Sequence, residues 1–309
     1  MTPNLVSDRP ASISLLRIFA MLIIGFLFIG NVIALLTVSL LYDGNLSEAM
    51  TDPVGHPEIQ TILVIAQGLA AFVGLVLIPW YYLKTFEHRS PFNFVRAFPS
   101  VVWFALLVVM TVALVVGISP ITEWNAEVEL PSWLGAFGDF MNEMERQAKQ
   151  LTDAMTSGMT PASFALIFIV VAIIPAIGEE LVFRGLIQTE LQRALGNPHL
   201  GIWLTAAFFS AFHMQFFGFF PRMFIGALLG YLYFWSGNLW YPIVGHFLNN
   251  GLQLIGIYLM QLNLLDFDVE STEQAPLPIV GISLLLLAGM LYYCSKNLTP
   301  TASARDFPK

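Results

Sequence analysis

The chain has 309 residues, of which 57% are hydrophobic and 11% are charged, and its mean hydropathy is +0.72. Soluble domains carry about 25% charged residues, so the composition excludes an ordinary soluble protein and predicts a polytopic membrane protein. The formal net charge of -8 argues against nucleic acid as a partner, and the single Cys294 excludes an intramolecular disulfide and a thiolate metal cluster.

Eight apolar stretches have about the length at which a helix crosses a bilayer, which takes roughly 20 residues. They are residues 16–41, 61–83, 100–118, 161–183, 200–217, 221–236, 240–261 and 277–294. The predicted fold is therefore all-α, a transmembrane helix bundle of about eight spans. No short apolar region with a small-residue cleavage site stands at the N-terminus, so we expect the first stretch to be a retained span.

Lysine and arginine residues predict the orientation, because they concentrate in cytoplasmic loops. With the N-terminus inside, ten of the thirteen fall on the cytoplasmic side: Arg9, Arg17, Lys84, Arg89, Arg96, Arg184, Arg193, Lys296, Arg305 and Lys309. The other three fall outside: Arg146, Lys149 and Arg222. Both termini are therefore predicted to be cytoplasmic, including a short polar tail from Thr299.

The predicted external loops are acidic. The first of these loops carries four acids: Asp43, Glu48, Asp52 and Glu58. Seven more lie between Glu123 and Asp153, and four between Asp266 and Glu273. A solvated surface explains these charges, and the alternative is capture of cations or basic peptides.

The stretch between Ser119 and Thr160 is long enough to hold structure of its own. Its apolar residues recur at spacings of three and four: Trp133, Phe137, Phe140, Met141 and Met144. This pattern predicts an amphipathic helix lying at the membrane surface, with a lid over the bundle as the alternative.

Ionisable residues inside apolar stretches are the candidate functional residues, since a charge in hydrocarbon is unfavourable and is usually kept for function. Glu180 and Arg184 are four residues apart, the spacing of a helical ion pair. Glu179 projects about 100° away from Glu180. One carboxylate can thus be neutralised by the arginine, while the other stays free to take a proton from water.

Pro175 precedes these carboxylates and has no amide hydrogen, so the carbonyl of Val171 loses its helical partner. Together with Gly178, it predicts a kink or local opening through which water reaches Glu179.

Further along the chain, His246 and Asn250 share one helix face. Both side chains can donate to one oxygen, as in an oxyanion hole. A lone histidine or Glu–Arg pair is commonly a packed structural group, and Gly226 and Gly230 are explained by close helix packing. The coincidence of three polar patches in apolar surroundings favours function.

These patches resemble the markers of the CPBP family of intramembrane proteases, which includes the CAAX prenyl endopeptidases and the bacteriocin-processing and immunity-related proteins. The three markers stand here as Glu179-Glu180-x-x-x-Arg184, Phe209-x-x-x-His213 and His246-x-x-x-Asn250. The resemblance covers roughly residues 161–262, which it implies are a catalytic core. The flanking segments 1–160 and 263–309 are then N-terminal spans with external loops, and a final span with its tail.

The resemblance implies an eight-helix core that hydrolyses peptide bonds at or within the membrane. By that analogy Glu179 activates the attacking water with help from His213. His246 and Asn250 would hold the carbonyl oxygen. The supporting residues would be Glu180 and Arg184. No cofactor is expected. The expected partners are the lipid bilayer and a peptide or lipidated-peptide substrate, and nucleic acid is not among them.

Two alternatives stay open. Glu179, His213 and His246 with one water form a possible zinc ligand set, although no His-Glu-x-x-His helix is present. A transporter or a non-enzymatic immunity scaffold is the other, although no internal repeat supports a transporter. The size of the chain and its loops fit a bacterial inner-membrane protein.

The predicted spans place Glu179 and His213 at different depths in the membrane. Glu179 falls near the cytoplasmic end of its predicted span, whereas His213 lies about 20 Å along a span counted from residue 200. Either that span begins later, or the helix tilts so that His213 meets the carboxylates.

Overall fold

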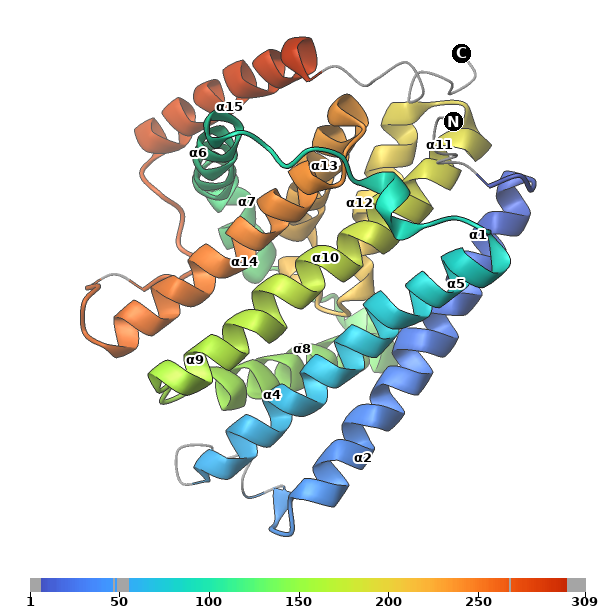
Figure 1. Ribbon diagram of the computed structural model, residues 1–309. Helices are drawn as coiled ribbons and strands as arrows, with labels where there is room; N and C mark the ends of the chain where they lie inside the picture. The colour runs from blue at the N-terminus through green and yellow to red at the C-terminus, as the bar shows by residue number, and fades with distance from the viewer. Residues whose placement is uncertain (1–6, 47, 49–55, 267, 299–309) are drawn as a thin grey trace.

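The computed structural model describes residues 7–46, 48, 56–266 and 268–298. Across these residues the chain is helical, with no strand, which confirms the all-α prediction (Figure 1). The predicted charges Asp52, Arg305 and Lys309 and the tail from Thr299 lie outside the described residues.

The N-terminal part is a pair of long helices that lie side by side in Figure 1. The first comprises α1 (Ala11–Leu22), the π-helical η1 (Ile23–Gly30) and α2 (Asn31–Leu41). The second comprises α4 (Pro57–Ala71), the π-helical η2 (Phe72–Leu77) and α5 (Ile78–Phe86), followed by the short η3 (Pro91–Phe94). Pro57 and Pro91 stand in the first turns of their helices, where the missing amide hydrogen is not needed.

The helix that carries Glu179 is longer than the sequence predicts. It runs without interruption from Pro161 to Leu195, through α9 (Pro161–Phe168), η5 (Ile169–Ile173), α10 (Ile174–Glu180), η6 (Leu181–Gln188) and α11 (Thr189–Leu195). Thr160 caps its start, and Gly196 ends it with φ 60°, a conformation that favours glycine. The predicted end at residue 183 was therefore wrong, and Glu179 lies near the middle of this helix.

The next two helices form a closely packed hairpin: α12 (Pro198–Phe212) and α13 (Phe219–Ser236), joined by η7 (Phe216–Gly218). A Cβ on Gly226 would lie 3.3 Å from Ala206, and one on Gly230 would lie 2.8 Å from Ile202. The prediction that these glycines allow close helix packing is thus confirmed.

This hairpin also resolves the depth of His213. Because the preceding helix continues to Leu195, α12 starts only at Pro198 and runs back along it. Gly226 contacts both Arg184 and Phe209, so those two residues lie at one level. His213 follows Phe209 by one helical turn, as Glu180 precedes Arg184, and both therefore lie one turn beyond that level.

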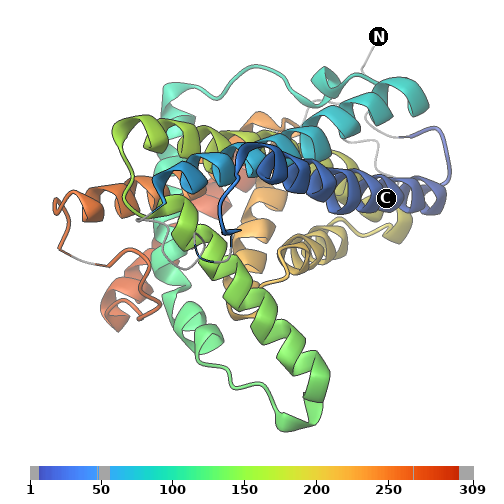
Figure 2. The same ribbon diagram turned by 90° about the horizontal axis from the view of Figure 1, so that it is seen from below.

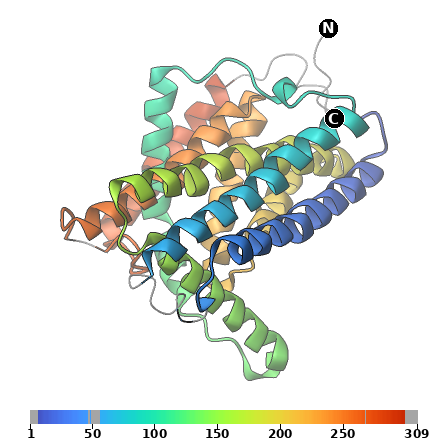
Figure 3. The ribbon, with the colours of Figure 1, turned by 60° about the horizontal axis from the view of Figure 1, so that its bottom comes forward.

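The remaining helices flank this centre. They are α6 (Val101–Gly117), α7 (Ser119–Ala126), η4 (Ser132–Leu134), α8 (Gly135–Thr156), α14 (Trp240–Gln261) and α15 (Leu277–Asn297). The helices α15 and α6 pack together and lie next to each other in Figure 1. Figures 2 and 3 show α8 extending away from the bundle, with the aromatic residues Trp133, Phe137 and Phe140 exposed. The predicted helix in this loop is confirmed, and its contact with the membrane surface stays a prediction.

Five helices are long and apolar enough to cross a membrane: Ala11–Leu41, Glu58–Phe86, Pro161–Leu195, Phe216–Ser236 and Leu277–Asn297. A sixth is counted if α6 and α7, which meet at a bend of 46°, form one span. All eight predicted stretches are helical, but the count of about eight spans is not confirmed. The helix α12 has only 15 residues, and α14 is polar in its middle, around His246 and Asn250.

Two of the charges used to predict orientation lie inside helices of the bundle. Arg184 is fully buried and is not a cytoplasmic loop residue. Arg222 lies within the apolar helix Phe216–Ser236 and not in an external loop. Without these two, nine of the ten predicted inner charges and two of the three predicted outer charges remain, so the direction of the bias is unchanged.

Candidate active site

A fully buried ion pair lies at the centre of the bundle. The Arg184 Nη1 lies 2.6 Å from the Glu180 Oε1, and neither side chain is exposed. The other terminal nitrogen of Arg184 donates to the Gly226 carbonyl at 3.0 Å, and the guanidinium lies over the Phe209 ring at 4.6 Å. These contacts fix the arginine in one orientation between α12 and α13.

The imidazole of His246 lies between the two adjacent carboxylates. Its Nδ1 is 2.7 Å from the Glu180 Oε1, and its Nε2 is 3.9 Å from the Glu179 Oε2. An ionised carboxylate only accepts hydrogen bonds. Nδ1 therefore carries the hydrogen in the neutral ring, and Nε2 directs a lone pair toward Glu179.

Glu179 differs from Glu180 in having no guanidinium partner. Its side chain is 12% exposed, and its Oε2 makes no hydrogen bond with the described residues. The charged groups around it act at longer range, namely His246, Glu180, Arg184 and Arg222. A buried carboxylate oxygen without a partner is unfavourable unless water or substrate completes it.

His213 lies beside this cluster, and the Phe209 ring contacts both His213 and His246. The Phe209 ring centroid is 5.0 Å from the His213 ring and 5.9 Å from the His246 ring. The His213 Nδ1 lies 2.9 Å from the Phe209 carbonyl, an acceptor, so its Nε2 is the free acceptor of the neutral ring. His213 makes no direct bond to Glu179 among the contacts of the described residues.

Asn250 bonds to a backbone carbonyl that the sequence predicts to lack a helical donor. Its Nδ2 donates to the Val171 carbonyl at 3.0 Å, the group that Pro175 leaves without an α-helical donor. Its Oδ1 accepts from the Asn249 side chain at 3.1 Å. Asn250 therefore bridges α14 to the helix that carries Glu179, and one of its two amide hydrogens is used for that bridge.

Before Glu179, where the sequence predicts a kink or local opening, the helix is not interrupted. It changes to π-helix in the segment η5 (Ile169–Ile173), just before Pro175. Gly178 serves packing, because a Cβ there would lie 2.8 Å from the Leu75 side chain.

Two residues near the cluster were not predicted as site residues. Arg222 donates to the Gln215 carbonyl and side chain at 3.3 and 3.1 Å, and it interacts electrostatically with Glu179 and His213. The signal for it was a basic residue at the start of the predicted span 221–236, which was counted among the external charges. The contact of the Phe209 ring with both imidazoles had no signal beyond its place in the motif.

A metal site was the alternative predicted for Glu179, His213 and His246. Among residues 7–46, 48, 56–266 and 268–298, no group of three or more His, Cys, Asp or Glu side chains is arranged to hold a metal ion. The Nδ1 atoms of His213 and His246 are bonded to a carbonyl and to Glu180, which leaves each Nε2 available, as in metal-bound imidazoles. The three side chains are nevertheless not grouped around a common point, so we derive no step through a metal.

Comparison with known proteins supports the resemblance drawn from the motifs. Residues 161–252 match the family model of type II CAAX prenyl endopeptidases described as Rce1-like, and this segment contains every predicted site residue. The uncharacterized protein YpbD of Bacillus subtilis (strain 168) is 35% identical over 77 residues, which are 24% of this chain and 36% of YpbD. The match thus spans about a third of that relative. No solved structure matches this chain.

Proposed function

We propose that this integral membrane protein, whose residues 161–252 match the type II CAAX prenyl endopeptidase model, is an intramembrane endopeptidase. The observation that carries the proposal is the buried His246 imidazole, which lies 2.7 Å from one carboxylate and 3.9 Å from the other. A proton acceptor without a cationic partner, next to an imidazole in a fixed tautomer, is what general base catalysis requires.

In the proposed first step, one water lies between the Glu179 Oε2 and the His246 Nε2. The 3.9 Å between these atoms is too long for a direct hydrogen bond, but a water can bind to both of them. Glu179 takes a proton from this water, and the water oxygen forms a bond to the carbonyl carbon of the substrate peptide. His213, with its Nε2 unengaged, helps to orient the water.

In the second step the negative charge on the carbonyl oxygen must be stabilised. We assign this role to Asn250, whose second amide hydrogen is not used by Val171, and to His246, whose Nε2 receives the water proton from Glu179 and donates it in a hydrogen bond to the oxygen. The bond between carbon and nitrogen then breaks, and this proton passes to the leaving amine. Atoms balance as one water added across one peptide bond.

Glu180 and Arg184 support the site without touching substrate in this proposal. The Glu180 carboxylate accepts from the His246 Nδ1 and so fixes which ring nitrogen faces Glu179. Arg184 compensates the charge of Glu180. The substrate class is a membrane-associated peptide or lipidated peptide, and the proposed location is a bacterial inner membrane with both termini in the cytoplasm.

The test is cleavage of membrane-tethered reporter peptides by purified protein in liposomes, with a prenylated CAAX reporter and an unmodified reporter of the same sequence. We expect Glu179→Ala to lower the cleavage rate by roughly 10²–10⁴-fold, the usual contribution of a general base. Glu143→Ala, which removes a glutamate from the outer face of α8, is the matched control and should keep full activity.

A fully active, correctly inserted Glu179→Ala protein would exclude this function. Washing with a chelator, followed by metal analysis, separates the proposed mechanism from the zinc alternative. The glutamate mechanism predicts unchanged cleavage by metal-free protein, whereas a zinc enzyme would lose activity and regain it on addition of zinc.

A further inference from the structure

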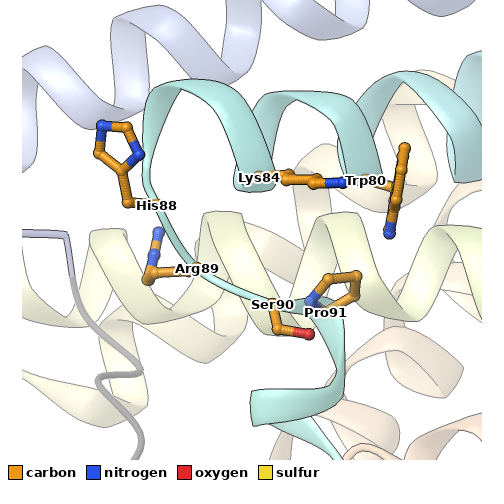
Figure 4. Close-up of a pocket in the computed structure, with 6 residues that line it drawn as sticks. All are labelled: Trp80, Lys84, His88, Arg89, Ser90 and Pro91. Carbon is orange, nitrogen blue, oxygen red and sulfur yellow. The ribbon is translucent and has the colours of Figure 1, made fainter.

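A second pocket lies at the end of α5, and none of the residues of the candidate active site lines it. Its volume is about 510 Å³, within the range of roughly 300–1,000 Å³ that is usual for ligand sites. Figure 4 shows the lining residues: Trp80, Lys84, His88, Arg89, Ser90 and Pro91. Three of them carry basic groups and none carries a carboxylate, so the lining suits an anion.

The two permanent cations are held in different ways. The Lys84 ammonium lies 4.9 Å from the Trp80 ring centroid, in the last turn of α5 and exposed. The Arg89 guanidinium is buried and 3.5 Å from Glu87, a carboxylate that also lies 3.9 Å from Arg9. Burial lowers the pKa of Arg89 from its ordinary value, and Glu87 opposes that shift. A cation that has lost part of its hydration is further stabilised by an anion in the pocket.

The backbone at His88 is an independent sign of a built site. His88 has φ 51°, in the left-handed region that favours glycine, while the Arg89 amide donates to the Leu83 carbonyl at 2.9 Å and closes the end of α5. This is the position where helices usually have glycine. A histidine held there is unfavourable for the backbone, and strain of this kind concentrates at binding sites.

The pocket lies at the end of a helix that is long and apolar enough to cross a membrane. The apolar helix Glu58–Phe86 ends beside it. Trp80, Phe86 and Phe92 are 41%, 49% and 76% exposed, and exposed aromatic residues at the end of a span are typical of the layer of lipid headgroups. A ligand here meets basic groups on one side and hydrocarbon on the other.

We propose that this pocket binds the phosphate of an anionic phospholipid. Lys84 and His88 supply hydrogen-bond donors to the phosphate oxygens, Arg89, bonded to Glu87, adds positive charge, and the hydroxyl of Ser90 can donate a further bond. The acyl chains would leave the pocket past Trp80 into the bilayer. Basic pockets at the cytoplasmic side of helix bundles bind anionic headgroups in this way, and inorganic phosphate shares the same chemistry.

The test is the binding of phosphatidylglycerol and phosphatidylcholine to the full chain in neutral detergent, followed by native mass spectrometry. We expect a preference for phosphatidylglycerol, and about fivefold weaker binding of that lipid for Lys84→Gln, since one basic residue contributes about that factor. Lys296→Gln is the matched control. Lys296 lies in the last turn of α15, over the Tyr292 ring at 5.6 Å, and does not line this pocket, so its removal should leave binding unchanged.

His88→Gly separates the ligand contact from folding. It should weaken phosphatidylglycerol binding while leaving the unfolding temperature unchanged or higher, because glycine adopts this φ without strain. Equal binding of the two lipids by the wild type would overturn the proposal, as would unchanged binding in both Lys84→Gln and His88→Gly. Displacement of the lipid by equimolar inorganic phosphate would assign the pocket to a soluble anion instead. Peptide cleavage enters none of these measurements, so they are independent of the proposed protease function.

Discussion

Arg184 and Glu180 are fully buried, so each charge is tolerated in the interior only because the other is present. Neither side chain has any solvent exposure, and the second oxygen of Glu180 has no hydrogen-bond partner among the described residues. Removing two charges from water is unfavourable, and their attraction offsets the cost only while both are present. The pair is therefore weak evidence for stability but a strong constraint on mutation.

We expect Arg184→Ala to destabilise the protein by about 3–5 kcal/mol, because it leaves the Glu180 charge buried without its partner. Denaturant unfolding in detergent measures this. The matched control is Arg146→Ala, which removes an arginine bonded to Glu143 on exposed α8. Hydrogen bonds from Arg146 and Gln147 lower the pKa of Glu143 to about 2, yet exposed pairs contribute little to stability. Equal destabilisation by both substitutions would contradict the special role of burial.

Asn250 and Pro175 give a second prediction at this scale. Asn250→Ala leaves the Val171 carbonyl without its side-chain donor, so we expect a loss of about 1–3 kcal/mol in the free energy of unfolding. Pro175→Ala restores a backbone N–H that can donate to the same carbonyl. The double mutant should therefore be less destabilised than the sum of the two single mutants.

Additive effects of the two substitutions would show that the carbonyl does not couple these residues. The cleavage rate gives a separate reading of Asn250. If the residue also holds the oxyanion, Pro175→Ala should restore stability to Asn250→Ala without restoring activity.

The sequence predicted much of this site but not its contacts. It predicted the Glu180–Arg184 pair because a spacing of four is local to one helix. It predicted the orphaned Val171 carbonyl because that follows from the covalent structure of proline. It could not predict that Asn250, 79 residues away, would bond to that carbonyl, nor that the Phe209 ring would contact both imidazoles, because both depend on how distant helices pack.

At the scale of helices, side chains from one helix bond to the backbone of its neighbour. Arg184 and Gln188, one turn apart, donate to the carbonyls of Gly226 and Gly230, also one turn apart, each at 3.0 Å. The equal spacing means that the helix of Glu179 and α13 run in the same direction here. Glycine on α13 lets the backbones approach closely enough for these bonds.

We expect Gly230→Leu to destabilise the protein strongly, because even a Cβ there would lie 2.7 Å from the Gln188 Oε1 and 2.8 Å from Ile202. Gly289→Leu is the matched control. Gly289 also lies within a helix of the bundle, α15, but a Cβ there meets nothing within 4 Å. Thermal unfolding of the two variants in one detergent compares them, and the prediction fails if Gly230→Leu unfolds at the temperature of the control.

Helix existence was predictable here, whereas some helix ends were not. All eight apolar stretches are helical, and the bounds of α14 match the predicted residues 240–261. The prediction ended the helix of Glu179 at residue 183 because Arg184 was taken for a loop charge. Burial of Arg184 against Glu180 lets that helix continue to Leu195, and this tertiary contact cannot be seen in the hydropathy of one segment.

At the scale of the whole molecule, charged residues mark two different ends of the bundle. Lys84 and Lys296 lie in the last turns of apolar helices, and Arg89 follows the end of α5. The acidic helix α8 extends from the bundle in Figures 2 and 3 and precedes the start of the helix of Glu179. The positive-inside rule predicts that the basic residues lie in the cytoplasm and α8 outside.

We expect labelling with a membrane-impermeant thiol reagent to report this orientation. Thr85 at the end of α5 and Asn142 on α8 are both exposed, so a cysteine at either position should be tolerated. The native Cys294 is buried and should give little background. In intact spheroplasts Asn142→Cys should react and Thr85→Cys should not, whereas both should react in opened membranes. Reaction of Thr85→Cys alone in intact spheroplasts would show that the molecule has the opposite orientation. The basic pocket would then face the outer leaflet and the acidic helix the cytoplasm, against the distribution of charge from which the orientation is argued.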